Sequence, residues 1–171
     1  PSAATAAGRT TVGRSVLGTV GAWQHVIGRE YERIRGIDPD PDGLQYWTTQ
    51  LRAGRSPRAL RAALWGATTT ANDAWVAALY TTELGRTVDP AGRAWALAQL
   101  ASGQTRSQLA GHVLASAEGV RALVARWTQD LFGRAPTPSE AAGWTGALHD
   151  GTDELTVRSR MFAAAAYVPL A

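Results

Sequence analysis

The chain has 171 residues and 45% of them are hydrophobic, which is enough to bury the core of one compact domain or of a short row of repeated units. It has no cysteine, which excludes disulfides, thiolate metal sites and a cysteine nucleophile, and no apolar run approaches the roughly 18 residues of a transmembrane helix. All 17 basic residues are arginine against 14 acidic ones, and since the arginines are scattered, the net charge of +3 does not favour nucleic-acid binding.

The first segment, PSAATAAGRT, is rich in Ser, Ala, Thr and Gly. This composition is typical of linkers and not of packed cores. We therefore expect residues 1–13 to form a flexible linker of a processed or longer chain. The next residues, about 14–35, are expected to form a helix that caps the remainder.

A motif then occurs three times without a gap, starting at Tyr31, Tyr80 and Thr128, which are 49 and 48 residues apart. The copies begin YERIRGIDPDPDGLQYW, YTTELGRTVDPAGRAWA and TQDLFGRAPTPSEAAGW. The matching positions are mainly glycine, proline and apolar: Gly36, Gly85 and Gly133; Pro41, Pro90 and Pro138; Leu51, Leu100 and Leu148; Gly54, Gly103 and Gly151; Trp65, Leu114 and Phe162. A repeat of this length is typical of helical arrays.

Each copy is predicted to contain three helices joined by two turns. The first glycine of each copy should end a helix, and the proline five residues later should begin the next one, because the first helical position needs no N–H donor. The residues before these prolines are the predicted N-caps: Asp40, Asp89 and Thr137. Thr137 and Glu140 have the spacing of a capping box. A third helix should begin near Ser56, near Thr105 and near Thr152.

No stretch has the sustained alternation that predicts a strand. The predicted fold is all-α, an array of three similar three-helix modules preceded by the linker. We place the capping helix and first module at 14–71, the second module at 72–119 and the third at 120–171.

The segment GIDPDPDGLQYW has aspartates at alternate positions, as a calcium loop does. Counting from Asp38, however, the twelfth position is Thr49, where such a loop needs a bidentate Glu. The other two copies keep the N-cap and its proline but not the series of carboxylates. We therefore predict no metal site and no cofactor.

The side chains that commonly perform catalysis do not form a recognisable set. His25, His112 and His149 occupy three different repeat positions. Only His149 has an acidic residue at the spacing that metal-binding helices use, Asp153, and the helix is expected to end between them at Gly151. No serine lies in a nucleophile elbow of the Gly-x-Ser-x-Gly type. We predict that the protein is not an enzyme and has no catalytic residue.

Seven tryptophans raise the alternative of a carbohydrate-binding module, because flat aromatic rings stack on sugars. Most of them align with aliphatic residues in the other copies, which predicts burial. Trp95 aligns with Tyr46 and is expected in the core or at its rim. Trp23 aligns with Asn72, and Trp127 aligns with Leu79 but also with Glu30, so Trp23 and Trp127 are the predicted exposed rings and candidate ligand or partner contacts.

The densest basic cluster lies in LRAGRSPRALRAAL: Arg52, Arg55, Arg58 and Arg61. Arg58 and Arg61 would share a helix face, and the other two flank the preceding turn, so the four could converge on an anion. Such clusters are usually solvated faces, and this interpretation is preferred.

The pattern of Tyr80, Gly85-Arg86 and Asp89-Pro-Ala-Gly92, followed by an aromatic residue, Leu and Gly, resembles the family catalogued as domain of unknown function 4214. The resemblance covers roughly residues 26–167, and the chain is more distantly similar to the linker domain of phycobilisome linker polypeptides. It departs from the pattern at Ile37, which replaces the arginine, and at Thr137 and Glu140, which replace Asp and Gly.

The resemblance implies tandem helical modules of secreted or surface-associated bacterial proteins, and it supplies no catalytic residues. We therefore expect an extracellular or cell-surface structural module that mediates assembly. Its partners would be other proteins or further copies of itself, with a glycan as the alternative. Repeat units bury their apolar faces mainly against neighbours, so the outer surfaces of the terminal modules are the expected docking places.

Overall fold

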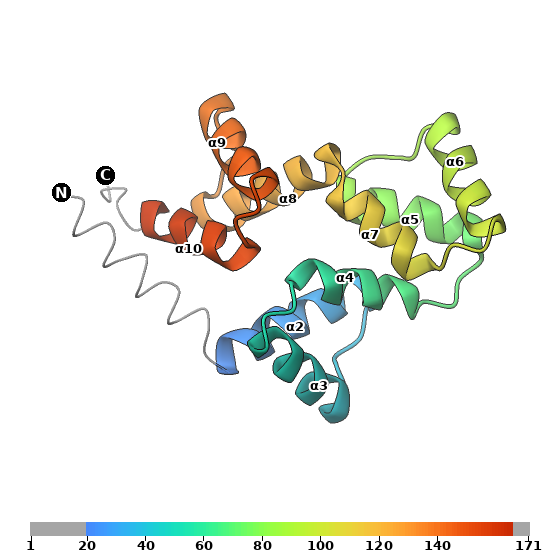
Figure 1. The fold of residues 1–171 in the computed structure, drawn as a ribbon, viewed down its shortest axis with the longest axis horizontal. Coiled ribbons are helices and arrows are strands. Elements are labelled where there is room, and N and C mark those ends of the chain that lie inside the picture. The colour runs from blue at the N-terminus through green and yellow to red at the C-terminus, as the bar shows by residue number, and fades with distance from the viewer. Residues whose placement is uncertain (1–19, 166–171) are drawn as a thin grey trace. The chain divides into compact units, whose positions relative to one another are not determined.

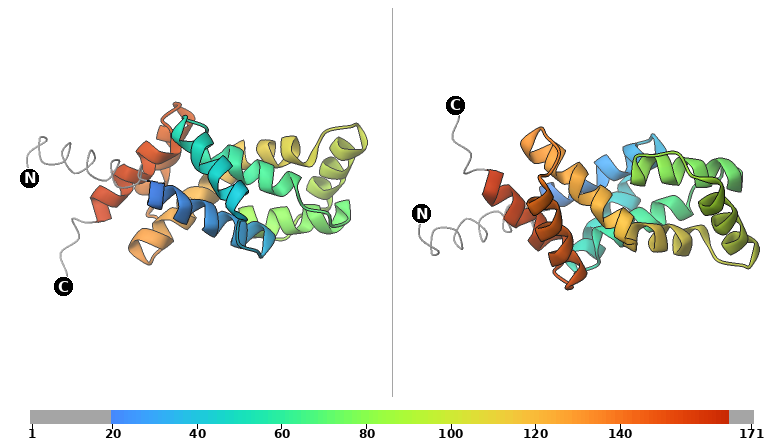
Figure 2. Two further views of the ribbon diagram at one scale, coloured as in Figure 1. Left: turned by 90° about the horizontal axis from the view of Figure 1, so that it is seen from below. Right: turned by 90° about the horizontal axis from the view of Figure 1, so that it is seen from above.

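The computed structural model describes residues 20–165, and within this range the chain forms nine helices and no strand (Figure 1, Figure 2). The helices are α2 (Val20–Arg35), α3 (Pro41–Arg52), α4 (Pro57–Gly66), α5 (Asn72–Leu84), α6 (Pro90–Ala101), α7 (Arg106–Ala115), α8 (Ala117–Phe132), α9 (Pro138–His149) and α10 (Glu154–Ala165). The all-α prediction is confirmed. The predicted linker 1–13 and the start of the capping helix at 14–19 lie outside the described residues.

The first helix of each copy ends where its glycine predicted. Helices α2, α5 and α8 are followed by Gly36, Gly85 and Gly133, with φ angles of 65°, 70° and 66°. This left-handed conformation costs a glycine little because it has no Cβ, and it turns the chain out of the helix. The helix stops predicted from the sequence are therefore confirmed.

The second helices, α3, α6 and α9, each begin at the predicted proline. Asp40 and Asp89 cap them, since each carboxylate accepts a hydrogen bond from a backbone N–H three residues later, at 2.7 and 2.8 Å. Thr137 and Glu140 form the predicted capping box. These caps satisfy N–H groups that have no partner inside the helix.

The third helices, α4, α7 and α10, also begin at the predicted places. Ser56 caps α4 and Thr105 caps α7, where Gln108 completes a second capping box. Asp153 accepts a hydrogen bond from Thr156 N at 2.9 Å, at the start of α10. All three modules therefore share the same sequence of helix boundaries.

A tyrosine and a glycine are paired across the first turn of two modules. A Cβ placed on Gly43 would lie 2.8 Å from Tyr31 Oη, and one on Gly92 would lie 3.3 Å from Tyr80 Oη. The glycine therefore leaves room for the phenol at the start of the next helix. In the third module Thr128 replaces the tyrosine, and the glycine position carries Glu140 instead.

The chain divides into two compact units. One comprises residues 24–122, and the other combines the segment up to Trp23 with the segment from Leu123 onwards. In the unit 24–122, the broadest contact between helices is that of α4 with α7 (Figure 1). Its core is a cluster of buried side chains from α4 to α7: Ala62, Trp65, Trp75, Val76, Leu79, Tyr80, Ala96, Leu109, Ala110, Val113 and Leu114.

The other unit has its own core, in which α8 and α10 contribute Leu123, Trp127, Val157 and Met161. One expectation is wrong here. Phe162 aligns with the core residues Trp65 and Leu114, yet its side chain is 48% exposed. Trp65 and Leu114 lie in the core that α4 and α7 share, whereas α10 contributes Val157 and Met161 to a different core, against which Trp144 and Leu148 of α9 pack.

Candidate interaction surface

A largely buried charge network in the unit 24–122 is structural. Glu83, whose side chain is fully buried, accepts hydrogen bonds from Arg33 Nη2 and Trp65 Nε1, both at 2.8 Å. Arg33 also pairs with Glu30 and donates to the carbonyl of Thr82 at 3.3 Å. Burial alone would lower the pKa of Arg33, but the two carboxylates raise it. The network thus links α2, α4 and α5 and holds its arginine fully charged.

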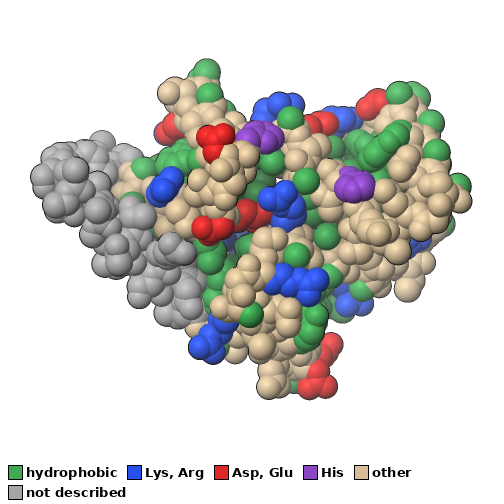
Figure 3. All heavy atoms as spheres, in the orientation of Figure 1, with side chains coloured by type: hydrophobic (Ala, Val, Ile, Leu, Met, Phe, Trp, Pro, Cys, Tyr) green, Lys and Arg blue, Asp and Glu red, His purple; other side chains and the backbone are tan. Residues whose placement is uncertain are grey.

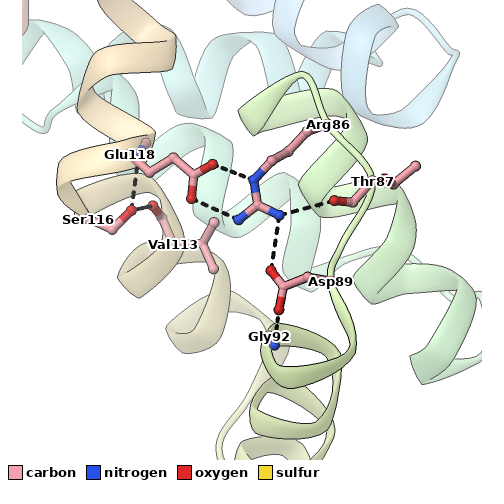
Figure 4. A network of polar contacts seen from close by, with 8 residues as sticks. Arg86, Thr87, Asp89, Gly92, Val113, Ser116 and Glu118 are labelled. Carbon is pink, nitrogen blue, oxygen red and sulfur yellow. Dashed lines mark hydrogen bonds and ion pairs between the residues drawn. The ribbon is translucent and has the colours of Figure 1, made fainter.

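A second network joins the turn after α5 to the first turn of α8 (Figure 4). Arg86 pairs with Glu118 through two hydrogen bonds, one of them 2.9 Å from Nη2 to Oε2, and its Nη1 reaches Asp89 at 3.2 Å. These hydrogen bonds from Arg86 lower the pKa of Glu118, and the Gly92 N–H and then Arg86 lower that of Asp89. The arginine therefore fixes the turn to the N-cap of α6.

The third module repeats this arrangement with a different carboxylate. Arg134 donates to both oxygens of Glu140 at 2.8 Å and to the Ala135 carbonyl at 3.0 Å. The hydrogen bonds from Arg134, together with that from Thr137 N, lower the pKa of Glu140 from 4.5 to about 2. The arginine of the Gly-Arg pair therefore connects the end of one helix to the first residues of the next helix.

The described residues contain no cluster with the composition of a metal site, since nowhere in 20–165 do three or more His, Asp or Glu side chains gather in a way that could hold an ion. Asp40, the central aspartate of the calcium-like segment, is engaged as the N-cap of α3. His25, His112 and His149 are all exposed. The face in Figure 3 shows acidic and basic side chains dispersed over several helices.

The two tryptophans predicted to be exposed are buried. Trp23 is 2% exposed and Trp127 is 6% exposed. Trp127 belongs to the core cluster with Leu123, Val157 and Met161. The matching position of the first module holds Glu30, which is half-buried because it pairs with Arg33. One position is thus filled by an ion pair in one module and by a ring in another, and neither Trp23 nor Trp127 offers a stacking platform.

The predicted basic cluster does not form one surface. Arg52 and Arg55 are exposed and Arg58 is half-buried, but Arg61 is 2% exposed. Arg61 is in α4, and its neighbours Leu60 and Ala62 are buried as well. Arg55 lies over the Trp47 ring at 5.4 Å from its centroid. Because Arg61 is buried while Arg52 and Arg55 are exposed, the four arginines do not form one surface for an anion. The prediction that all four lie on a solvated face is also wrong for Arg61.

Besides Phe162, the large rings exposed among the described residues are Tyr46 on α3, at 50%, and Trp95 on α6, at 43%. These residues occupy the same repeat position, which was predicted to be in the core or at its rim. The next residue in each helix, Trp47 or Ala96, is buried, so the burial pattern changes sharply between the two neighbouring positions. The sequence offered one indication that this position lies outside the core. The equivalent residue of the third module is Gly143, which has no side chain to bury.

Beside the Arg33 network, a pocket of about 330 Å³ is lined by the loop between α4 and α5 and by residues of α2, α4 and α5: Ile34, Arg35, Trp65, Ala67, Thr68, Thr69, Thr70, Ala78 and Thr82. Arg106 donates to the carbonyls of Thr68 and Thr70 and lies over the Trp75 ring. Thr68 Oγ1 donates to the Trp65 carbonyl at 2.8 Å. Arg106 therefore holds the loop that forms one wall of the pocket.

No helix among residues 20–165 is long and apolar enough to cross a membrane. Comparison of the chain with curated proteins and with solved structures found no match. A family model, the domain of unknown function DUF4214, matches residues 62–123. The matched range runs from within α4 through the whole second module into α8, so it contains the Arg86 network and Trp95. The chain therefore contains a DUF4214 domain, at residues 62–123.

Proposed function

We propose that this helical protein is a non-catalytic structural module of a larger secreted or cell-surface bacterial protein, and that it binds a protein partner through α3 and α6. The observation that carries the proposal is the exposure of Tyr46 and Trp95, two large rings at the same position of two successive modules. Two repeats that present the same kind of residue at the same place offer a partner two similar contacts.

The chemistry of these rings supports a contact role. Tyrosine and tryptophan are enriched at protein interfaces, where a few buried aromatic anchors provide most of the binding free energy. Tyr46 lies edge-to-face with Trp47 at 5.2 Å between ring centroids, and its Oη accepts a long hydrogen bond of 3.4 Å from Arg55. The ring is therefore partly oriented before any partner arrives, which lowers the entropic cost of binding.

The use of the carboxylates supports a non-catalytic role. Glu83, Glu118 and Glu140 are each engaged by an arginine, and Asp40 and Asp89 cap helices. A general acid or base needs a pKa near the working pH, whereas the pKa values of Glu118, Asp89 and Glu140 are all lowered. These groups suit structural pairing better than proton transfer.

The test is a double variant, Tyr46→Ser with Trp95→Ser, compared with Ile37→Ser, which removes an apolar side chain of similar exposure, 47%, from a different turn. Proteins of a bacterial surface fraction that bind the unchanged chain would be identified, purified and titrated individually. We expect a partner whose affinity falls at least tenfold in the double variant and not in the control, at unchanged melting temperature. Equal affinity of all three chains for every purified partner, or substrate turnover by the chain, would contradict the proposal.

A glycan is the second candidate partner, and one observation favours it. Trp95 and Tyr46 are exposed rings of the kind that stack on sugars, and Arg55 beside Tyr46 could donate to a sugar oxygen. Titration of soluble bacterial polysaccharides, followed by tryptophan fluorescence, distinguishes the two. Saturable quenching that Trp95→Ser abolishes would assign the surface to a glycan, and a flat titration would leave the protein partner.

A further inference from the structure

The pocket lined by α2, α4, α5 and the loop between α4 and α5 lies where the first module meets the second, inside the unit 24–122. Its volume of about 330 Å³ is at the lower end of the range of small-molecule pockets, roughly 300–1,000 Å³. Ile34, Trp65 and Ala78 supply apolar lining. The polar lining consists of one arginine and four threonines: Arg35, Thr68, Thr69, Thr70 and Thr82.

Contacts within the protein hold each wall of this pocket. Arg33 and Trp65 both donate to the buried carboxylate of Glu83 at 2.8 Å, which joins α2 and α4 to α5. Arg106, which does not line the pocket, donates to two carbonyl groups of the loop, one of them at 2.6 Å. The pocket is therefore formed before any ligand arrives, which lowers the entropic cost of binding.

The pocket lies where this junction departs from the helical repeat. Residues 68–70 form a loop, whereas the equivalent residues 117–119 form the first turn of α8, and Ser116 alone separates α7 from α8. Three consecutive threonines favour the loop, because β-branched side chains have low helix propensity. Arg35 likewise has Leu84 as its equivalent. The polar lining is thus not part of the repeated pattern of helix boundaries.

Several polar groups of the lining are not used by the fold. Among residues 20–165, no carboxylate pairs with Arg35, whose guanidinium lies over the Tyr31 ring at 5.9 Å from its centroid. The hydroxyls of Thr69, Thr70 and Thr82 have no hydrogen-bond partner within this described range. The pocket thus offers one cation and three hydroxyls beside apolar side chains.

We propose that this pocket binds one sugar ring that carries a carboxylate, as a hexuronic acid does. The guanidinium of Arg35 would pair with the carboxylate, and threonine hydroxyls can donate to and accept from sugar hydroxyls. The C–H groups of the ring would contact the apolar lining. A carboxylate without hydroxyls would leave the threonines unused, and a neutral sugar would leave the arginine unused. The site is separate from Tyr46 and Trp95 and does not depend on the proposed partner binding.

Heteronuclear NMR titration of the full chain with sodium glucuronate tests the proposal. We expect a dissociation constant of roughly 1 mM, because one sugar ring is a small ligand, with shifts centred on residues 67–70 and the Trp65 indole. Acetate and glucose, which each carry part of this chemistry, should bind at least tenfold more weakly. Methyl glucuronide identifies the source: binding of both glucuronates supports a residue within a polysaccharide, and binding of the free acid alone supports a free sugar acid.

Arg35→Gln should weaken glucuronate binding at least tenfold, and Thr82→Val, which removes a hydroxyl at similar volume, should weaken it several-fold. Arg52→Gln is the matched control, because it removes the same charge from an exposed arginine of the same module and should bind like the unchanged chain. Melting temperatures would show that each variant is folded.

Absence of saturable binding, acetate binding as tight as that of glucuronate, or unchanged affinity in Arg35→Gln would overturn the proposal. The double variant at Tyr46 and Trp95 should still bind glucuronate, and Arg35→Gln should still bind the protein partner. The two proposals can therefore fail separately.

Discussion

The second helix begins at the equivalent residue in the first and third modules, but different side chains pack beside its first turn. In the first module Tyr31 covers the start of α3, and Gly43 leaves the ring the room it needs. In the third module Thr128 is too small to reach, and Glu140 occupies the glycine position and binds Arg134. The helix boundary is thus retained while the residues on either side change together, so a single position cannot be interpreted without its partner.

A second contrast concerns the placement of arginine–carboxylate pairs. The pair of Arg33 and Glu83 lies inside the core of the unit 24–122, whereas that of Arg134 and Glu140 lies at the surface. Loss of the carboxylate should have different effects on stability at the two places. Removal of a buried carboxylate leaves the N–H groups that donated to it without a partner, whereas groups at the surface can bind water instead. Substitutions at the two places therefore separate core stability from local capping.

The largest effect is expected from Glu83→Ala. This change removes the acceptor for both Arg33 and Trp65 Nε1 in a buried environment and should cost about 3 kcal/mol of unfolding free energy. Asp73→Ala is the matched control, because it breaks the exposed pair with Arg93 and should change stability little. Urea denaturation measures both. Similar losses in the two variants would show that burial does not distinguish these pairs.

Gly43→Ala should have the next largest effect, because the new Cβ would press on Tyr31 Oη. Crowding of this kind costs about 1–3 kcal/mol, and the better helix propensity of alanine offsets about 0.5–1 kcal/mol. We expect a net loss of about 1 kcal/mol and a smaller loss for Gly92→Ala, where the contact is 3.3 Å.

The pairing of Tyr31 and Gly43 can be tested separately with Tyr31→Phe, which removes the atom that the Cβ would meet. In this background Gly43→Ala should lose most of its penalty. A double-mutant cycle with denaturant unfolding gives the coupling free energy. Absence of coupling would mean that the glycine is needed for another reason.

The stability of the third module is expected to depend on pH through Glu140. Arg134 and the Thr137 N–H lower the pKa of Glu140 to about 2, so the stabilisation from this carboxylate is complete above 4.5 and is lost as the pH falls toward 2. Glu140→Gln removes the charge but keeps the capping box, as Gln108 does in α7. The melting temperature of the variant should fall less steeply over this range than that of the unchanged chain, and parallel curves would contradict the assignment.

The smallest change in stability is expected from a substitution of Ile37. This residue is exposed and occupies the repeat position of Arg86 and Arg134. Ile37→Arg would let a guanidinium reach Asp40, as Arg86 reaches Asp89. An exposed pair of this kind contributes between zero and about 1 kcal/mol, with loss at high salt. Thermal denaturation at low and high salt would detect it, and destabilisation at low salt would show that the isoleucine has a packing role.

The sequence predicted helix boundaries better than exposure, and the reason is physical. A helix stop such as Gly36 or a start such as Pro41 depends on local backbone geometry, which neighbouring residues specify. Burial depends on which helix covers a side chain. Arg61 is therefore buried against expectation, and Phe162 is exposed although Trp65 at the same repeat position is not.

The candidate surface was found only in part for a related reason. Residues at equivalent repeat positions have similar surroundings at Tyr46 and Trp95 but not at Trp127 and Glu30. At this position the Trp127 ring of one module and the Glu30–Arg33 ion pair of another fill similar space, although one is apolar and the other is charged. Sequence patterns thus identified the modules, but the contacts between side chains were needed to assign their surfaces.

The packing of Trp65 against Trp75 gives the protein an intrinsic optical probe. Their rings lie edge-to-face with centroids 6.1 Å apart, and the indole N–H of Trp75 donates to the Trp65 carbonyl at 3.0 Å. Two rigidly held indoles at this distance should couple and produce a strong near-ultraviolet circular dichroism band, which fixed tertiary packing alone preserves. Helices that persist after this signal has disappeared would show that the packing around the buried tryptophans had loosened while the secondary structure remained.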